Sequence, residues 1–212
     1  MAWLTNTLGS SVGKKLMMAI TGLSFCGFLA VHLIGNLTLY GGSDFFTAYV
    51  KHLHAYGPII TVAELGLVAL AVVHVLTGLT LFIGNLNARP IRYAVKKNAG
   101  GRTVGSSTMP YTGILLLAFL IFHLLDIRFP TPEPDTVYQL VFNSFAKKGY
   151  IFIYIIGVFI AAVHVSHGLW SAFQTLGANH PKYMPFIQGL GIAFSVIVAI
   201  GFGFIPVYIS TL

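Results

Sequence analysis

The sequence predicts an all-α membrane protein with five transmembrane helices, of which the first four form a bundle. Of its 212 residues, 56% are hydrophobic and only 8% are charged, and the mean hydropathy is +0.83. This composition leaves too little polar surface for a soluble globular protein. Five apolar runs are each long enough to cross about 30 Å of hydrocarbon as a helix.

The five predicted helices lie near residues 16–40, 58–84, 108–127, 149–176 and 186–210. The first run is about 24 residues long, whereas the apolar core of a signal peptide has about 7 to 15, so we expect it to remain as a helix. Prolines 130, 132 and 134 separate the third helix from the fourth, because proline cannot continue a helix. We expect residues 1–212 to form a single membrane domain with short loops.

The net charge of +7 is carried mainly by loops, where lysine and arginine set the orientation of a membrane protein. One side of the predicted membrane holds eight basic residues, namely Lys14, Lys15, Arg89, Arg92, Lys96, Lys97, Arg102 and Lys182. The other side holds Lys51, Arg128, Lys147 and Lys148. The positive-inside rule therefore predicts a cytoplasmic N-terminus and an external C-terminus. Because topology and lipid contact account for this charge, no nucleic-acid partner is expected.

Four histidines inside the apolar runs repeat one pattern. His32-Leu33 is followed 42 residues later by His74-Val75-x-x-Gly78-Leu79, and His123-Leu124 is followed 41 residues later by His164-Val165-x-x-Gly168-Leu169. An ionisable side chain in hydrocarbon costs free energy and by default indicates a functional site. The single Cys26 has no partner in the chain, which excludes an internal disulfide and a cysteine-based metal site.

The rise of about 1.5 Å per helical residue sorts the four histidines into two depths. His74 and His164 should lie roughly 24 Å below the outer surface, and His32 and His123 only about 8 to 12 Å below it. Two imidazoles at one depth can fill both axial positions of a haem iron, and a site so filled passes electrons and does not bind oxygen.

The sequence therefore predicts two b haems, the inner one held by His74 with His164 and the outer one by His32 with His123. His167 competes with His164, but only His164 fits the repeat. Small residues beside the ligands, Gly78, Gly168 and Gly35, are expected to leave room for porphyrin.

Other polar residues have weaker assignments. Glu64 and Asp126 are candidates for proton exchange with a quinone, or else carboxylates that face water or a basic partner. Candidates to bind haem propionates are Lys15, Arg89, Arg102 and His180 on the inner side and Arg128 on the outer side. His52, His54 and His180 are expected to be solvated histidines in loops.

Five motifs carry a resemblance to a known family. They are Ser11-Val12-Gly13-Lys14-Lys15, His32-Leu33-Ile34-Gly35-Asn36-Leu37, Ala88-Arg89-Pro90, Thr108-Met109-Pro110-Tyr111, and the run from Gly168-Leu169-Trp170 to Pro181-Lys182-Tyr183. With them the chain, over nearly its whole length, resembles the single-chain, dihaem cytochrome b membrane anchor of bacterial succinate dehydrogenases and fumarate reductases. It has Ala162 where some relatives carry an acidic residue linked with proton movement.

The resemblance implies a multi-pass protein of the bacterial cytoplasmic (inner) membrane that binds a flavoprotein subunit and an iron–sulfur subunit on the cytoplasmic face. The chain would be a non-flavin subunit of a succinate:quinone oxidoreductase, with the dicarboxylate active site on a partner and a dimer of heterotrimers as a possible assembly. Its cofactors would be two b haems, with the histidine pairing given above, and menaquinone or a related quinone.

Two alternatives remain open at this stage. The chain could be the dihaem cytochrome b subunit of another respiratory complex, such as a hydrogenase or a formate dehydrogenase. In a different class, the histidines could form a proton or metal relay in a transporter, which would contain no haem.

Overall fold

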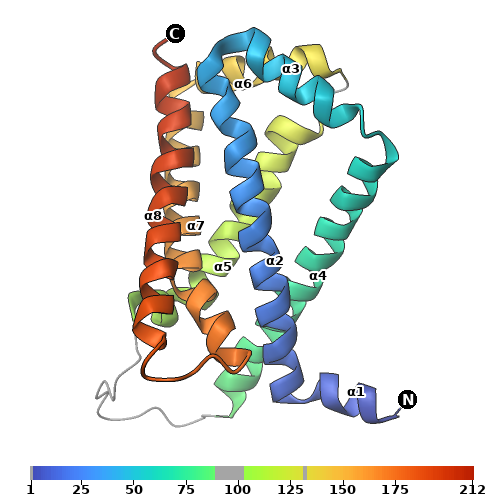
Figure 1. Ribbon diagram of the computed structural model, residues 1–212, viewed down its shortest axis with the longest axis vertical. Helices are drawn as coiled ribbons and strands as arrows, with labels where there is room; N and C mark the ends of the chain where they lie inside the picture. The colour runs from blue at the N-terminus through green and yellow to red at the C-terminus, as the bar shows by residue number, and fades with distance from the viewer. Residues whose placement is uncertain (1, 89–102, 131–132) are drawn as a thin grey trace.

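The computed structural model describes residues 2–88, 103–130 and 133–212, and every regular element in these ranges is helical (Figure 1). Five helices are long and apolar enough to cross a membrane, which confirms the five predicted helices. They are α2 (Ser11–Leu37), α4 (Pro58–Asn87), α5 (Val104–His123), α7 (Lys148–Thr175) and α8 (Met184–Ile209). Helix α5 continues directly into a π-helical turn, Leu124–Arg128.

Local sequence signals account for where the long helices begin. The Ser10 side chain accepts a hydrogen bond from the Gly13 N–H at 3.1 Å and caps α2. Thr103 and Ser106 exchange side-chain and backbone hydrogen bonds in a capping box at the start of α5. Before α4, Gly57 adopts a φ of 52°, which favours glycine, and Pro58 follows at the first helical position.

Three short helices occupy segments that the sequence analysis treated as loops or termini, namely α1 (Ala2–Gly9), α3 (Gly42–His54) and α6 (Val137–Phe145). We call the end of the bundle with α1 the N-end and the end with α3 and α6 the C-end (Figure 1). His52 and His54 therefore lie in the last turn of α3, where both are exposed, and not in a loop.

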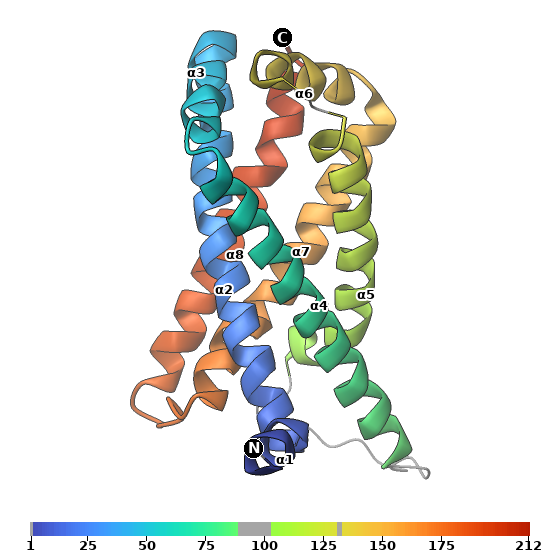
Figure 2. The same cartoon turned by 90° about the vertical axis from the view of Figure 1, so that its right-hand side faces the viewer.

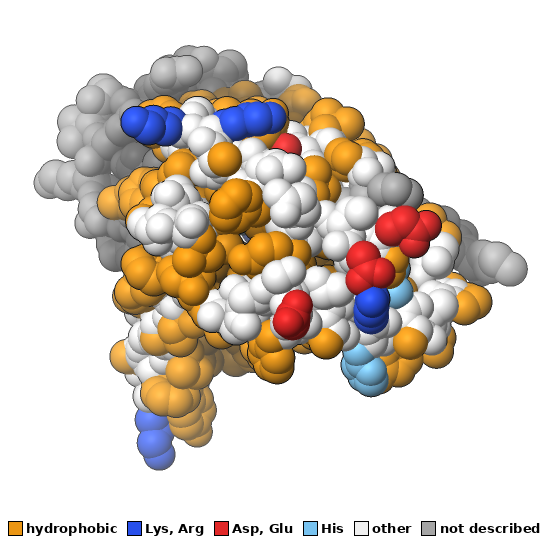
Figure 3. All heavy atoms as spheres, turned by 90° about the horizontal axis from the view of Figure 1, so that it is seen from above, with side chains coloured by type: hydrophobic (Ala, Val, Ile, Leu, Met, Phe, Trp, Pro, Cys, Tyr) orange, Lys and Arg blue, Asp and Glu red, His pale blue; other side chains and the backbone are white. Residues whose placement is uncertain are grey.

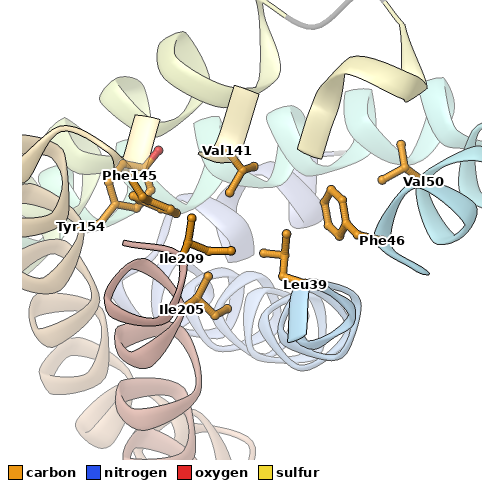
Figure 4. Close-up of a cluster of buried hydrophobic side chains, with 8 residues drawn as sticks. All are labelled: Leu39, Phe46, Val50, Val141, Phe145, Tyr154, Ile205 and Ile209. Carbon is orange, nitrogen blue, oxygen red and sulfur yellow. The ribbon is translucent and has the colours of Figure 1, made fainter. Parts of the chain in front are cut away.

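Helices α3 and α6 lie across the C-end because each has one apolar face. Their buried side chains join residues of α7, α8 and the short turn after α2 in one cluster, shown in Figure 4: Leu39, Phe46, Val50, Val141, Phe145, Tyr154, Ile205 and Ile209. An ion pair of 2.6 Å between Lys51 and Asp135 also ties α3 to the segment before α6. Figure 3 shows this end, where acidic and basic side chains lie among apolar ones.

The long helices do not pack equally. Helix α8 packs along α7, α7 also contacts α5 and α2, and α4 contacts mainly α2. Helix α4 is inclined to the other helices (Figures 1 and 2) and exposes apolar side chains along its whole length, including Val62, Val72 and Ile83. Helices α2, α4, α5 and α7 together carry the four histidines of the repeat.

Candidate functional site

The four repeated histidines form two pairs, each made by rings from two different helices. His74 of α4 faces His164 of α7, with ring centroids 6.5 Å apart and ring planes at 66°. His32 of α2 faces His123 of α5, with centroids 6.0 Å apart and planes at 78°. We call His74 with His164 the N-end pair and His32 with His123 the C-end pair. The structure thus brings together the same partners that the depth argument paired.

The spacing within each pair suits two ligands on opposite sides of one metal ion. A metal–nitrogen bond of about 2.0 Å on each side places the centroids of two axial imidazoles about 6.3 Å apart. A direct hydrogen bond between two imidazoles, with a nitrogen separation of about 2.9 Å, would bring the centroids to about 5.2 Å. The observed 6.0 Å and 6.5 Å lie close to the first value.

The two pairs lie at separate levels of the bundle. Thr21 contacts His74 of the N-end pair, and His32 of the C-end pair follows Thr21 by 11 residues on the same helix. At about 1.5 Å of rise per residue, the two levels are about 16 Å apart along α2. Thr112 and His123 have the same spacing on α5 and give the same separation.

Each ring of the N-end pair is held by a threonine of a neighbouring helix. The Thr21 Oγ1 atom lies 2.8 Å from Nδ1 of His74, and the Thr112 Oγ1 atom lies 3.1 Å from Nδ1 of His164. Each hydroxyl donates its own proton to a carbonyl one turn back in its helix, that of Met17 or Thr108. The threonine oxygen must therefore accept from the Nδ1–H, which leaves the lone pair on Nε2, as a metal ligand requires.

The C-end pair is held differently. Nδ1 of His123 lies 3.3 Å from the hydroxyl of Tyr154, while the amide nitrogen of Asn36 lies 3.4 Å and 3.5 Å from the two ring nitrogens of His32. That amide donates a shorter bond, 2.8 Å, to the carbonyl of His32. Both rings stack on a phenylalanine one turn earlier, Phe28 at 5.2 Å and Phe119 at 6.1 Å. Hydrogen bonding thus fixes the tautomer of His123 but not that of His32.

These contacts reveal a longer repeat than the histidines alone indicate. Four residues of α2 recur in α5 91 positions later, giving the pairs Met18/Met109, Thr21/Thr112, Gly22/Gly113 and Phe28/Phe119. Gly22 and Gly113 lie beside these rings, because an added Cβ would be in ordinary van der Waals contact with Cε1 of His74 and His164, at 3.5 Å and 3.4 Å. The sequence analysis missed the threonines, although their constant spacing from His32 and His123 was a usable signal.

The three glycines expected to leave room for porphyrin have other neighbours. A Cβ on Gly78 would lie 3.5 Å from the methyl carbon of Met18, and one on Gly168 would lie 4.0 Å from that of Met109. The space beside Gly35 is filled by the side chain of Tyr49 from α3, so that expectation was wrong for Gly35. Its missing side chain serves helix packing at the C-end.

His167 does not face the N-end pair. Its Nδ1 lies 3.4 Å from the hydroxyl of Thr103, and its ring makes an edge contact with Trp170 at 4.7 Å. Within the part of the chain that the structure describes, His164 is therefore the histidine of α7 that lies against His74.

The two candidate carboxylates have partners within the chain. Glu64 forms a two-pronged ion pair with Arg128, with Nε–Oε1 and NH2–Oε2 distances of 2.8 Å and 2.9 Å. Asp126 accepts hydrogen bonds from Ser144 at 3.2 Å and from Tyr154 at 2.9 Å. Glu64 thus matches the basic-partner interpretation, while Asp126 connects through Tyr154 to His123.

The propionate candidates are dispersed. Arg128 is engaged by Glu64, and Lys15 is exposed near the start of α2. His180 lies at the N-end, where its Nδ1 accepts the backbone N–H of Lys182 at 3.2 Å. Arg89 and Arg102 lie outside the described residues.

The donor set of each pair indicates what kind of metal it suits. Among residues 2–88, 103–130 and 133–212 there is no group of three or more His, Cys, Asp or Glu side chains that could hold a metal ion. Each pair supplies two imidazoles on opposing helices, which suits a metal that brings its remaining ligands with it, as the iron of haem does. The residues present therefore fit haem.

Comparisons with protein-family models, with curated proteins and with solved structures found no match to this chain.

Proposed function

We propose that this chain is a dihaem cytochrome b membrane anchor that transfers electrons between a membrane quinone, menaquinone or a related one, and an iron–sulfur partner subunit. The observation that carries the proposal is the presence of two histidine pairs, with centroids 6.5 Å and 6.0 Å apart, at separate levels of one bundle. Haem bound between the rings of each pair would supply a one-electron carrier.

The residues of the chain would hold and orient these carriers. Nε2 of His74 and His164 would hold the haem iron at the N-end, with Thr21 and Thr112 keeping the ring protons on Nδ1. His32 and His123 would be the donors at the C-end, with Phe28 and Phe119 stacked on their rings. Two levels about 16 Å apart would carry charge across part of the membrane.

The hydrogen bonds at the N-end pair favour this reading over a histidine relay in a transporter. A relay needs each imidazole to accept a proton on one side and release it on the other. Here both Nδ1 atoms donate to threonine oxygens whose own protons are committed to backbone carbonyls. The remaining lone pairs on Nε2 of His74 and His164 then belong to two rings with centroids 6.5 Å apart, and a bound cation could use both.

The family resemblance supplies the rest of the proposal. The N-end would face the cytoplasm and bind the iron–sulfur subunit and the flavoprotein, which would carry out the succinate or fumarate reaction. Three described lysines of the larger basic set, Lys14, Lys15 and Lys182, lie beside the N-terminal ends of α2 and α8. Glu64 and Asp126, both toward the C-end, stay candidates for proton exchange with the quinone.

A reduced-minus-oxidised absorbance spectrum and a haem count on the purified chain test the proposal. We expect two b haems per chain, falling to one in His164→Ala and remaining two in His167→Ala, which removes an imidazole from the same helix without touching the N-end pair. A purified protein without haem absorbance would refute the proposal and favour the histidine relay of a transporter. Co-purification with a flavoprotein and an iron–sulfur subunit would separate this anchor from the cytochrome of a hydrogenase or formate dehydrogenase.

A further inference from the structure

His123 differs from the other three histidines in the hydrogen-bonding partners that its Nδ1 atom reaches. The hydroxyl of Tyr154 lies 3.3 Å from Nδ1 and donates to Oδ2 of Asp126 at 2.9 Å. The other carboxylate oxygen of Asp126 accepts from the hydroxyl of Ser144 at 3.2 Å. Three helices, α5 with its π-helical turn, α6 and α7, contribute to this chain of hydrogen bonds.

Which group donates in each of these hydrogen bonds follows from the protons that each group carries. An ionised carboxylate only accepts, so the single proton of the Tyr154 hydroxyl is committed to Asp126. The Tyr154 oxygen can then only accept from His123, which places the ring proton on Nδ1 and the lone pair on Nε2. This is the tautomer that the N-end rings obtain from threonine, but here the acceptor is itself polarised by a carboxylate.

The backbone of this region is built to place Asp126. The π-helical turn Leu124–Arg128 begins at the residue after His123, and π turns inside helices are frequent at functional sites. Tyr154 is only 7% exposed and Ser144 only 4%. The tyrosine ring lies beside Phe145 (Figure 4) and also contacts the rings of Phe119 and Phe122. In such apolar surroundings a hydrogen bond to a charged group is stronger than in water.

We propose that Asp126, acting through Tyr154, is a positioning residue that makes His123 a more electron-donating ligand than the histidines of the N-end pair. Hydrogen bonds from the remote ring nitrogen raise the basicity of a ligating imidazole, and a carboxylate-backed acceptor raises it more than a neutral hydroxyl. A more basic ligand favours the oxidised iron. The inference rests on the proposed function, because it concerns the metal centre at the C-end.

The test uses the intact purified protein and the midpoint potentials of both haem centres. The variants are Tyr154→Phe, which removes the hydroxyl, and Asp126→Asn, which keeps the shape and removes the charge. Tyr150→Phe removes a hydroxyl one turn earlier on α7 and is the matched control, since Tyr150 packs against Phe122 and Lys147. The C-end centre is identified as the one that His32→Ala removes.

We expect both variants to raise the potential of the C-end centre and to leave that of the N-end centre unchanged, with no shift in Tyr150→Phe. A tenfold change in the balance between oxidised and reduced iron corresponds to about 59 mV for one electron. The double variant should shift the potential no further than Tyr154→Phe alone, because Asp126 acts through the tyrosine.

Several outcomes would overturn the inference without touching the proposed function. If two haems are bound and neither variant moves the C-end potential, Asp126 does not act on His123. If the shifts of the two single variants add in the double variant, the charge of Asp126 acts on the iron directly through space, and its proposed action through Tyr154 is wrong. If Tyr154→Phe loses the C-end haem, the potential of the C-end centre is measured in Asp126→Asn, which retains the Tyr154 hydroxyl, and an unchanged potential there overturns the inference. A wild-type protein without haem would instead overturn the proposed function itself.

Discussion

Removing the hydroxyl of Thr21 should weaken the binding of one haem and not the other. In Thr21→Val, Nδ1 of His74 loses an acceptor at 2.8 Å, and an unsatisfied buried N–H costs about 1–3 kcal/mol. Loss of such a partner typically weakens metal binding by about 10- to 100-fold. Thr112→Val should act on the same haem from α5, and more weakly, because its bond to His164 is longer at 3.1 Å.

Transfer of haem from the purified protein to excess apomyoglobin measures this effect. The N-end haem should leave faster in both valine variants, while the C-end haem should be retained as in the unaltered protein. Thr21→Ser keeps the oxygen and is the matched control, so it should behave almost as the unaltered protein does. Equal retention in Thr21→Val and Thr21→Ser would refute the role of the hydroxyl, and faster loss of the C-end haem would refute the assignment of levels.

Three further outcomes are expected. Gly157→Ala would press a Cβ against the ring of Phe119, which stacks on His123. Because overpacking costs about 1–3 kcal/mol, the protein should melt at a lower temperature and lose the C-end haem first. An unchanged melting curve would contradict the close contact between Gly157 and Phe119. A cysteine at Thr211 should react with a membrane-impermeant maleimide from outside intact cells, and labelling only after permeabilisation would reverse the proposed orientation. In a double-mutant cycle with Glu64→Gln and Arg128→Gln, side chains 40% and 51% exposed should couple by about 0–1 kcal/mol, and a coupling above about 3 kcal/mol would mean that the pair is desolvated.

Helix positions and the pairing of the histidines could be predicted from the sequence because both depend on regular geometry. An apolar run of fixed length specifies a long helix, and a constant rise per residue gives each histidine a depth. His74 and His164 meet because they lie equally far along α4 and α7, which both run from the C-end to the N-end, and no knowledge of side-chain contacts was needed to pair them.

Contacts that depend on local irregularities could not be predicted. Asp126, which accepts from Tyr154, lies in the π-helical turn after His123, and nothing in the residue pattern there distinguishes a π turn from an α-helix. Helix α3 was missed because its apolar face is short, with Phe46 and Val50 one turn apart among polar residues. Thr21 and Thr112 were within reach, because a search for repeats that included polar residues other than histidine would have found them.

Helices α2 and α5 each carry one histidine of the C-end pair and one threonine of the N-end pair. An α-helix turns as a rigid rod, so a rotation of α2 that swings the His32 ring also carries the Thr21 hydroxyl away from its imidazole. The geometry of the two histidine levels is consequently linked through the helix backbone, although no side chain of one pair needs to touch the other. A change that rotates α2 or α5 about its own axis should therefore be felt at both levels, whereas the removal of a single hydroxyl, which leaves the helix in place, should be felt at one.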